Sequence, residues 1–261
     1  MQKAKKMKKN ASASSASLRR TVEDSDVQRF EALAAHWWDE DGPLKPLHML
    51  NPVRLGYIKA QACKRFHRDG RDFQALQGLK VADIGCGGGL VAEPLCRMGA
   101  EVTAIDAGPE NIRFAERHSA QAGLKIDYRA QTAEELAAKS AGTFDIVTAL
   151  EIVEHVADVE LFLSSCCKLV KKGGLLILST LNRTPKAYLL GILAAERVLG
   201  WVPPGTHEWK KFLKPSELAA PLERGGLETI DVTGMIYKPL TRKFALNRND
   251  LDVNYLLTAQ K

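Results

Sequence analysis

The hydrophobic and polar positions of this chain predict strands and helices that follow one another along the sequence. From residue 80 onward, short apolar runs alternate with stretches of helical periodicity. The predicted strands are residues 80–84, 102–106, 126–129, 144–150, 175–181, 227–236 and 253–259. Such alternation builds a parallel sheet with helices on both faces. The loop between the last two strands has no room for a crossover helix, so these two are expected to run antiparallel. The pattern predicts an α/β fold with a seven-stranded sheet and one reversed strand.

Two helices are predicted ahead of this sheet. Residues 27–38 have helical periodicity and end in the aromatic pair Trp37-Trp38, after which residues 39–43 break the element. A second helix is expected to begin at Asn51-Pro52, with proline at its first helical position and Arg54 in its first turn. We expect residues 24–70 to form an N-terminal helical lid.

Residues 185–204 interrupt the regular alternation with a largely apolar stretch. The stretch is too short and too charged to cross a bilayer, which needs about 20 apolar residues. One interpretation is an amphipathic helix in the membrane interface, with Tyr188 and Trp201 at the depth of the headgroups. The other is a hydrophobic cover over the active site. The two interpretations are compatible.

The net charge of +6 belongs to the N-terminus rather than to the body of the chain. Residues 1–20 contain five lysines, Arg19 and Arg20 and no acid, so the remaining residues carry a charge of about −1. No nucleic-acid partner is therefore expected. Residues 1–20 are predicted to be a disordered basic tail, and residues 21–261 a single domain.

The tail and the cysteines bear on the cellular compartment. The tail lacks the apolar segment of a secretory signal, and its lysines are atypical of a transit peptide, which favours arginine on an amphipathic helix. The five cysteines contain no C-x-x-C pair and are odd in number, which fits a reducing compartment. We expect a cytoplasmic protein attached peripherally to the inner membrane, with a mitochondrial location as the alternative.

A glycine-rich turn follows the first predicted strand. The turn is Asp83-Ile84-Gly85-Cys86-Gly87-Gly88-Gly89, and the next strand ends at Asp106, twenty-one residues after Gly85. Glycine allows close approach of a ligand, and a carboxylate at this distance is placed to accept hydrogen bonds from ribose hydroxyls. The third glycine comes one residue earlier than in the dinucleotide fingerprint G-x-G-x-x-G. This spacing favours S-adenosylmethionine over a pyrophosphate ligand.

With these motifs the sequence resembles class I S-adenosylmethionine-dependent methyltransferases, and more closely the O-methyltransferases of ubiquinone biosynthesis. The resemblance covers the chain from about Asp26 to its end. It is carried by Trp37-Trp38-Asp39, Lys45-Pro46-Leu47-His48, residues 51–58, 83–89 and 179–183, Glu151-x-x-Glu154-His155-Val156, Pro204-Gly205-Thr206-His207 and Asp252-Val253-Asn254-Tyr255. It implies a Rossmann-like class I methyltransferase fold and a cofactor site that contains Arg54, Gly85, Asp106 and Leu150, beside the turn glycine Gly87.

Three further candidates come directly after the strand at residues 144–150. If a helix begins there, the i, i+3, i+4 spacing puts Glu151, Glu154 and His155 on one face. They would lie at the carboxyl ends of the strands, where open α/β sheets bind ligands. The resemblance implies that these three bind Mg²⁺, although imidazole is an unusual Mg²⁺ ligand. In one alternative His155 acts alone as general base, and in another the two acids only cap a helix.

The resemblance also implies a reaction and its partners. A methyl group would pass from S-adenosylmethionine to phenolic hydroxyls of polyprenyl catechol and demethylubiquinol intermediates, at a membrane surface and near other ubiquinone biosynthesis proteins. One competing hypothesis is an NAD-type oxidoreductase, which the glycine spacing and the reversed strand disfavour. Another is a non-catalytic lipid-binding member of a quinone biosynthesis complex. The intact set Asp106, Glu151, Glu154 and His155 argues against a lost active site.

Overall fold

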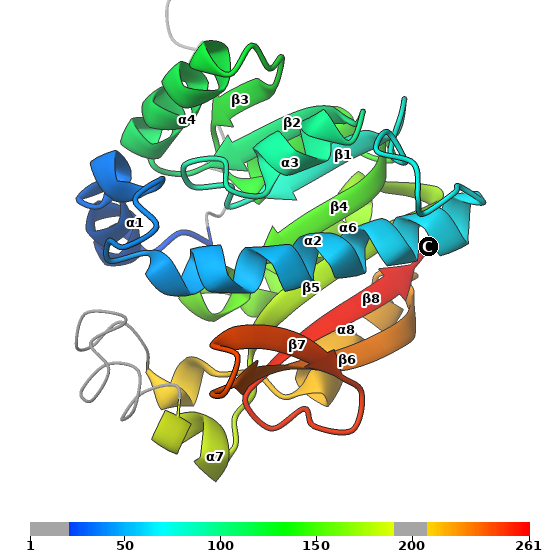
Figure 1. The fold of residues 1–261 in the computed structure, drawn as a ribbon. Coiled ribbons are helices and arrows are strands. Elements are labelled where there is room, and N and C mark those ends of the chain that lie inside the picture. The colour runs from blue at the N-terminus through cyan, green and yellow to red at the C-terminus, as the bar shows by residue number, and fades with distance from the viewer. Residues whose placement is uncertain (1–20, 191–207) are drawn as a thin grey trace, which may run out of the picture.

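The computed structural model describes residues 21–190 and 208–261 and contains a mixed sheet wrapped by helices (Figure 1). Eight strands form one sheet in the order β3-β2-β1-β4-β5-β8-β6-β7. Their bounds are β1 Lys80–Ile84, β2 Glu101–Asp106, β3 Asp127–Ala130, β4 Phe144–Leu150, β5 Val170–Leu181, β6 Glu228–Lys238, β7 Lys243–Asn247 and β8 Asn254–Gln260. All seven predicted strands are present, which confirms the α/β class.

The strand directions follow the prediction, but the strand count does not. Strands β1 to β5 pair in parallel, and β8 lies antiparallel between β5 and β6. The prediction of seven strands was wrong, because β7 adds an eighth strand at the edge, antiparallel to β6. This strand is short, and no residue of it is fully buried, so its sequence carries little of the alternation that marks a strand.

Helices cover both faces of the sheet, and each face has its own apolar core. One core joins the sheet to α2 (Lys45–Phe66), α3 (Ala92–Arg97) and α4 (Pro109–Gln121). The other joins it to α5 (Ala133–Ser140), α6 (Val159–Leu169) and α8 (Pro215–Arg224). In the second core Cys166 and Cys167 pack as small apolar side chains and form no disulfide.

The two N-terminal helices have other bounds than the sequence predicts. Helix α1 covers Asp24–Glu31, and a separate 3₁₀ turn, Ala34–His36, leads into Trp37. Helix α2 begins at Lys45, six residues before Asn51, and Pro52 lies inside it. Proline removes one helical hydrogen bond, and the long packed face of α2 tolerates this loss. A prediction based on proline therefore placed the start of α2 too late.

Two predicted segments lie largely outside the described residues. The basic tail at residues 1–20 is one, and most of the stretch at residues 185–204, with Trp201, is the other. The described beginning of that stretch is the short helix α7 (Pro185–Ala187). Within the described parts of the chain, no helix combines the length and the apolar character that a membrane crossing requires.

Candidate active site

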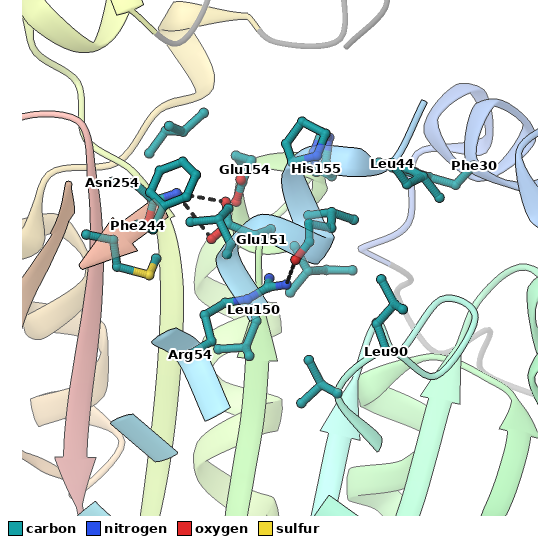
Figure 2. A pocket seen from close by; sticks show the side chains of 18 of the residues that line it. Phe30, Leu44, Arg54, Leu90, Leu150, Glu151, Glu154, His155, Phe244 and Asn254 are labelled. Atoms are coloured by element: carbon teal, nitrogen blue, oxygen red, sulfur yellow. Dashed lines mark hydrogen bonds between the residues drawn. The ribbon is translucent and has the colours of Figure 1, made fainter. Parts of the chain in front are cut away.

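A cavity of about 760 Å³ lies at the carboxyl ends of the parallel strands, and Phe30 and Leu44 of the N-terminal segment form part of its wall (Figure 2). Seven of the eight predicted site residues line it, namely Arg54, Gly85, Asp106, Leu150, Glu151, Glu154 and His155. Much of the remaining wall is apolar and comes from Phe30, Leu33, Leu44, Leu47, Leu90 and Phe244. The structure thus brings the predicted cofactor residues and the predicted catalytic residues into one apolar chamber.

At one end of the cavity, beside the glycine turn, the Asp106 carboxylate is held by three N–H donors. Its Oδ2 accepts from the Gly87 amide at 3.0 Å, and its Oδ1 accepts from the Gly108 amide at 2.8 Å and from Asn111 Nδ2 at 3.1 Å. Burial raises the pKa of Asp106, and these hydrogen bonds offset part of the rise. The carboxylate therefore stands in a fixed orientation at the end of β2.

The glycines of the turn are close to protein side chains. Gly85 and Gly87 have φ values of 72° and 52°, in the left-handed region that disfavours other residues. A Cβ on Gly85 would lie 2.3 Å from Ile152, and one on Gly87 would lie 2.2 Å from the Trp37 ring. Gly87, the eighth predicted residue, is thus covered by Trp37 rather than lining the cavity.

Arg54 projects from α2 into the cavity and is only 3% exposed. One of its terminal nitrogens donates to the Leu47 carbonyl at 3.1 Å, whereas its Nε has no hydrogen-bond partner among the described residues. Burial lowers the pKa of this guanidinium, opposed by the charges of Glu151 and Asp83. Arg54 therefore does not form a surface salt bridge, which is the ordinary role of an arginine on a helix.

Asp83 lies opposite Arg54 and was absent from the predicted site residues. It lines the same cavity and is buried, and its Oδ1 accepts a hydrogen bond from Thr148 at 2.7 Å. Its Oδ2 has no partner among the described residues, and burial raises its pKa to about 6. The sequence did contain a signal for Asp83, because it is the last carboxylate before the glycines of the turn.

At the other end of the cavity, the two glutamates follow β4 but do not share a helix face. Glu151 has a φ of 53°, and only a 3₁₀ turn, Val153–His155, follows it. Glu151 accepts hydrogen bonds from Ser179 Oγ at 2.6 Å and from Asn254 Nδ2 at 3.1 Å, the latter drawn in Figure 2. Glu154 is buried and accepts from Thr180 Oγ1 at 2.8 Å. The expected helical arrangement of the three candidates was wrong.

The surroundings of the buried Glu154 carboxyl favour its protonated form. Burial, followed by the neighbouring charge of Glu151, raises its pKa to about 7. Among residues 21–190 and 208–261, no three His, Cys, Asp or Glu side chains are arranged to hold a metal ion. The predicted Mg²⁺ ligands therefore do not form a ready ligand set in this arrangement.

His155 makes a contact that sequence reasoning missed. Its Nδ1 lies 3.2 Å from Oδ2 of Asp26 on α1, and the Phe30 ring packs edge-on against the imidazole. The hydrogen bond with His155 lowers the pKa of Asp26, although burial opposes the shift. A β-bridge between Val22, just before α1, and Val156, just after His155, holds the start of α1 beside His155. A carboxylate on Nδ1 favours the tautomer in which Nε2 carries the lone pair.

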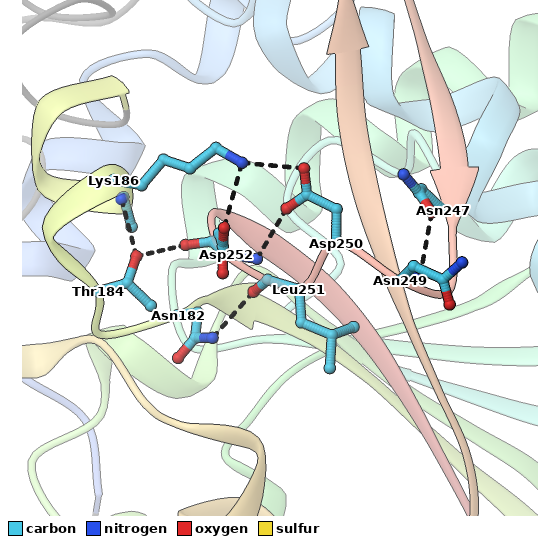
Figure 3. Close-up of polar contacts among 9 residues, drawn as sticks. Asn182, Thr184, Lys186, Asn247, Asn249, Asp250, Leu251 and Asp252 are labelled. Carbon is cyan, nitrogen blue, oxygen red and sulfur yellow. Dashed lines mark hydrogen bonds and ion pairs between the residues drawn. The ribbon is translucent and has the colours of Figure 1, made fainter.

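The rim of the cavity is fixed by a cluster of polar contacts between two loops (Figure 3). Lys186 Nζ lies 2.9 Å from Asp250 Oδ2 and 3.2 Å from Asp252 Oδ2. Asn182 donates to the Leu251 carbonyl, and Thr184 caps the first turn of α7. These contacts tie the start of α7 to the loop before β8.

Relatives of known name share most of this chain. It is 51% identical to a ubiquinone biosynthesis O-methyltransferase of Rhizobium etli over 93% of the chain and 97% of that protein. A protein of the same name from Sinorhizobium fredii is 49% identical over 93% of the chain and 97% of its own length. The chain belongs to the ubiquinone biosynthesis O-methyltransferases. The methyltransferase domain family also matches, over residues 82–178, so this member is an S-adenosylmethionine-dependent enzyme.

Solved structures agree on the fold of this O-methyltransferase. An S-adenosylmethionine-dependent methyltransferase from Thermotoga maritima has a TM-score of 0.61 at 17% identity and covers 90% of this chain and 99% of its own. The magnesium protoporphyrin IX methyltransferase of Synechocystis, with bound S-adenosylmethionine, has a TM-score of 0.57 at 18% identity and covers 93% and 100%. The family assignment selects the methyltransferase over the predicted oxidoreductase alternative.

Proposed function

We propose that this O-methyltransferase transfers the methyl group of S-adenosylmethionine to phenolic hydroxyls of polyprenylated catechol and quinol intermediates. The observation that carries the proposal is the shared apolar cavity, which joins the Asp106 and Arg54 end to the Glu154 and His155 end. An apolar wall suits a prenylated ring, and the polar ends suit a sulfonium donor and a phenol.

We call the end with Arg54 and Asp106 the donor end, and the end with Glu154 and His155 the acceptor end. The donor end has groups for each part of the cofactor. Arg54 can pair with the methionine carboxylate, and Asp83, whose Oδ2 has no partner among the described residues, can accept the ammonium group. Asp106 can accept hydrogen bonds from the ribose hydroxyls, and Leu150 can pack beside the adenosyl group at the end of β4. The uncompensated buried atoms of Arg54 and Asp83 fit a zwitterionic ligand between them.

The acceptor end supplies the base. His155, held by Asp26 on Nδ1, presents Nε2 to take the phenol proton, and the resulting phenolate oxygen attacks the sulfonium methyl in line. The products are an aryl methyl ether and S-adenosylhomocysteine. The reaction joins an anion to a cation, and an apolar wall that excludes water favours this loss of charge.

No step of the proposed mechanism uses the predicted Mg²⁺ ion. Glu151 and Glu154 are hydrogen bonded to Ser179, Asn254 and Thr180 and do not converge with His155 on one point that could hold an ion. In the proposal Glu151 and Glu154 shape the charge around the base, and Mg²⁺ is a variable of the experiment.

The deciding experiment follows methyl transfer from S-adenosylmethionine to a short-chain prenyl catechol by mass spectrometry. We expect a product heavier by one methylene unit, lost in His155→Ala and present with or without a chelator. Product that vanishes with chelator and returns with Mg²⁺ would replace the lone base with metal-assisted deprotonation. No product from enzyme that still binds S-adenosylhomocysteine would reject the proposed acceptor.

We also propose that the enzyme works at a membrane surface. Tyr188, Leu189 and Leu190 are consecutive, apolar and 45%, 56% and 45% exposed, next to the rim residue Lys186. Leu190 and Lys186 also line the cavity. We expect Leu189→Asp to reduce flotation with vesicles of anionic phospholipid, and Phe73→Asp, at a 90% exposed site in the loop before β1, to leave it unchanged.

A further inference from the structure

The N-terminal segment above the glycine turn has an apolar cluster of its own. Trp37, Leu44 and Leu90 are its buried members, and Phe30, Leu33 and Trp38 pack against them. Leu90 belongs to the turn after β1, whereas most of the others belong to the segment before α2. The cluster therefore fastens this segment to the region that the family uses for its cofactor, and not to the general core.

Trp37 lies across two glycines of that turn. A Cβ on Gly87 or Gly88 would come within 2.2 Å or 2.3 Å of the Trp37 side chain, so only glycine permits this packing. Trp37 is 7% exposed and also lines the cavity that contains Arg54 and Asp106. Its indole is a wall of the chamber on the side of the glycine turn.

A hydrogen-bond chain joins this indole to the carboxylate at the end of β2. Trp37 Nε1 donates to Asn111 Oδ1 at 3.0 Å, and Asn111 Nδ2 donates to Asp106 Oδ1 at 3.1 Å. Asn111 is 1% exposed, so water does not compete for these contacts. The orientation of the Asp106 carboxylate therefore depends in part on where Trp37 lies.

Trp38 holds the same segment from the outside. Its Nε1 donates to the Gly88 carbonyl at 2.9 Å, and its ring stacks on His118 with centroids 3.9 Å apart. His118 is in turn hydrogen bonded to the fully buried Glu93 at 2.6 Å. Two neighbouring tryptophans thus fix the segment to α4 and to the glycine turn before α3.

We propose that Trp37 is a cofactor-contact residue and that Asn111 is a positioning residue which couples it to Asp106. With S-adenosylmethionine in the cavity, the indole forms part of the wall against the cofactor, and the chain of hydrogen bonds through Asn111 keeps the ribose acceptor in place. The inference rests on the S-adenosylmethionine dependence of the family and not on the proposed acceptor.

The test is calorimetric titration of S-adenosylhomocysteine into variants of the full chain. Trp37→Ala is expected to raise Kd about tenfold or more, as truncation of a buried aromatic contact does. Trp209→Ala is the matched control, since Trp209 is 37% exposed and does not line the cavity; its Kd should stay within about twofold. An unchanged Kd in Trp37→Ala would overturn the proposal.

A second measurement covers the case in which Trp37→Ala does not fold. Trp37→Phe keeps an aromatic ring and is therefore the milder change. Saturation with S-adenosylhomocysteine should change tryptophan emission in the unaltered protein and in Trp209→Phe, and this change should be much smaller in Trp37→Phe, where, of the described tryptophans, only Trp38 remains beside the glycine turn. An undiminished emission change in Trp37→Phe would contradict contact between Trp37 and the cofactor.

The role of Asn111 is tested by a double-mutant cycle. If the Trp37 N–H acts on Asp106 through Asn111, its loss should have no further effect once Asn111 is removed. The double variant Asn111→Ala, Trp37→Phe should then bind S-adenosylhomocysteine no more weakly than Asn111→Ala alone. In Asn111→Ala, the KM for S-adenosylmethionine should rise, while kcat at saturating cofactor stays within about twofold of the unaltered protein. Additive losses would overturn the coupling. Titration needs no acceptor, so failure to methylate the catechol leaves this result unaffected.

Discussion

The buried carboxylates at the two ends of the cavity have different surroundings. At the donor end, three N–H groups hold Asp106, so the carboxylate is fixed even though burial raises its pKa. At the acceptor end, Glu154 accepts one hydroxyl hydrogen bond, lies near the charge of Glu151, and has a pKa of about 7. One carboxylate is held by several N–H donors, whereas the environment of the other favours its protonated form.

The largest effect is expected at the donor end. Asp106→Ala removes the acceptor of three buried N–H donors and the proposed partner of the ribose hydroxyls. S-adenosylhomocysteine should bind about 100-fold more weakly or not at all, measured by calorimetry. Asp127→Ala, on the next strand and paired with Arg129 at the surface, is the control. Binding that survives Asp106→Ala would mean that the donor end is not where the cofactor lies.

The donor end is also the part of the site that the sequence predicts best. A strand, a glycine turn and a second strand ending in an acid are local features, and Gly85 and Asp106, which they single out, line one cavity. That these two residues bind the cofactor stays a prediction. The predicted residues of the acceptor end also line this cavity, but their expected helical arrangement was wrong, because the left-handed backbone at Glu151 ends the local regularity. The contact between Asp26 and His155 spans 129 positions, and no local pattern encodes it.

The fold shows the same division between local and distant information. Seven strands follow from apolar runs, and four of them, β1, β4, β5 and β8, bury most of their residues. The eighth, β7, is half-exposed and depends on its partner β6. Helix α2 begins at Lys45 because its packing outweighs the single hydrogen bond that Pro52 removes. Elements defined by tertiary packing are therefore where sequence reasoning went wrong.

The next largest effect is expected at the base. Asp26→Asn can donate an amide N–H to Nδ1 of His155, which favours the tautomer with hydrogen on Nε2 and blocks proton uptake. We expect kcat to fall about tenfold or more while Kd for S-adenosylhomocysteine is unchanged.

The control for Asp26→Asn is Glu23→Gln. Glu23 precedes the same helix and pairs with Lys211 at 2.8 Å. Asp26 also pairs with Arg29, so Asp26→Asn removes an ion pair as well as the orientation of the imidazole. Glu23→Gln removes only an ion pair of the same region and therefore measures that part of the effect. Equal losses of kcat in both variants would assign the effect to anchoring of α1.

A smaller effect, on stability, distinguishes the two ends by pH. Burial raises the pKa of Glu154 from the ordinary glutamate value of 4.5 to about 7 in the folded protein. Folding therefore favours its protonated form, and this contribution is complete below pH 4.5 and lost as pH rises through about 7. Glu154→Gln mimics the protonated form. Its Tm should exceed that of the unaltered protein by several degrees at pH 8, with the difference shrinking toward pH 5. A pH-independent difference would place the Glu154 carboxyl in solvent.

The smallest effect is expected at the rim, where charges are exposed. Lys186 pairs with Asp250 and Asp252, and the side chain of Lys186 is 44% exposed (Figure 3). Exposed ion pairs contribute about 0–1 kcal/mol, so Lys186→Met should change Tm by only about 1–3 °C in low salt and by less in high salt. Its side chain also lines the cavity, so any larger change should appear in KM for the prenylated acceptor and not in cofactor binding. A rise in the Kd for S-adenosylhomocysteine would instead show that the rim and the donor end are energetically linked, and the separation of the two ends would fail.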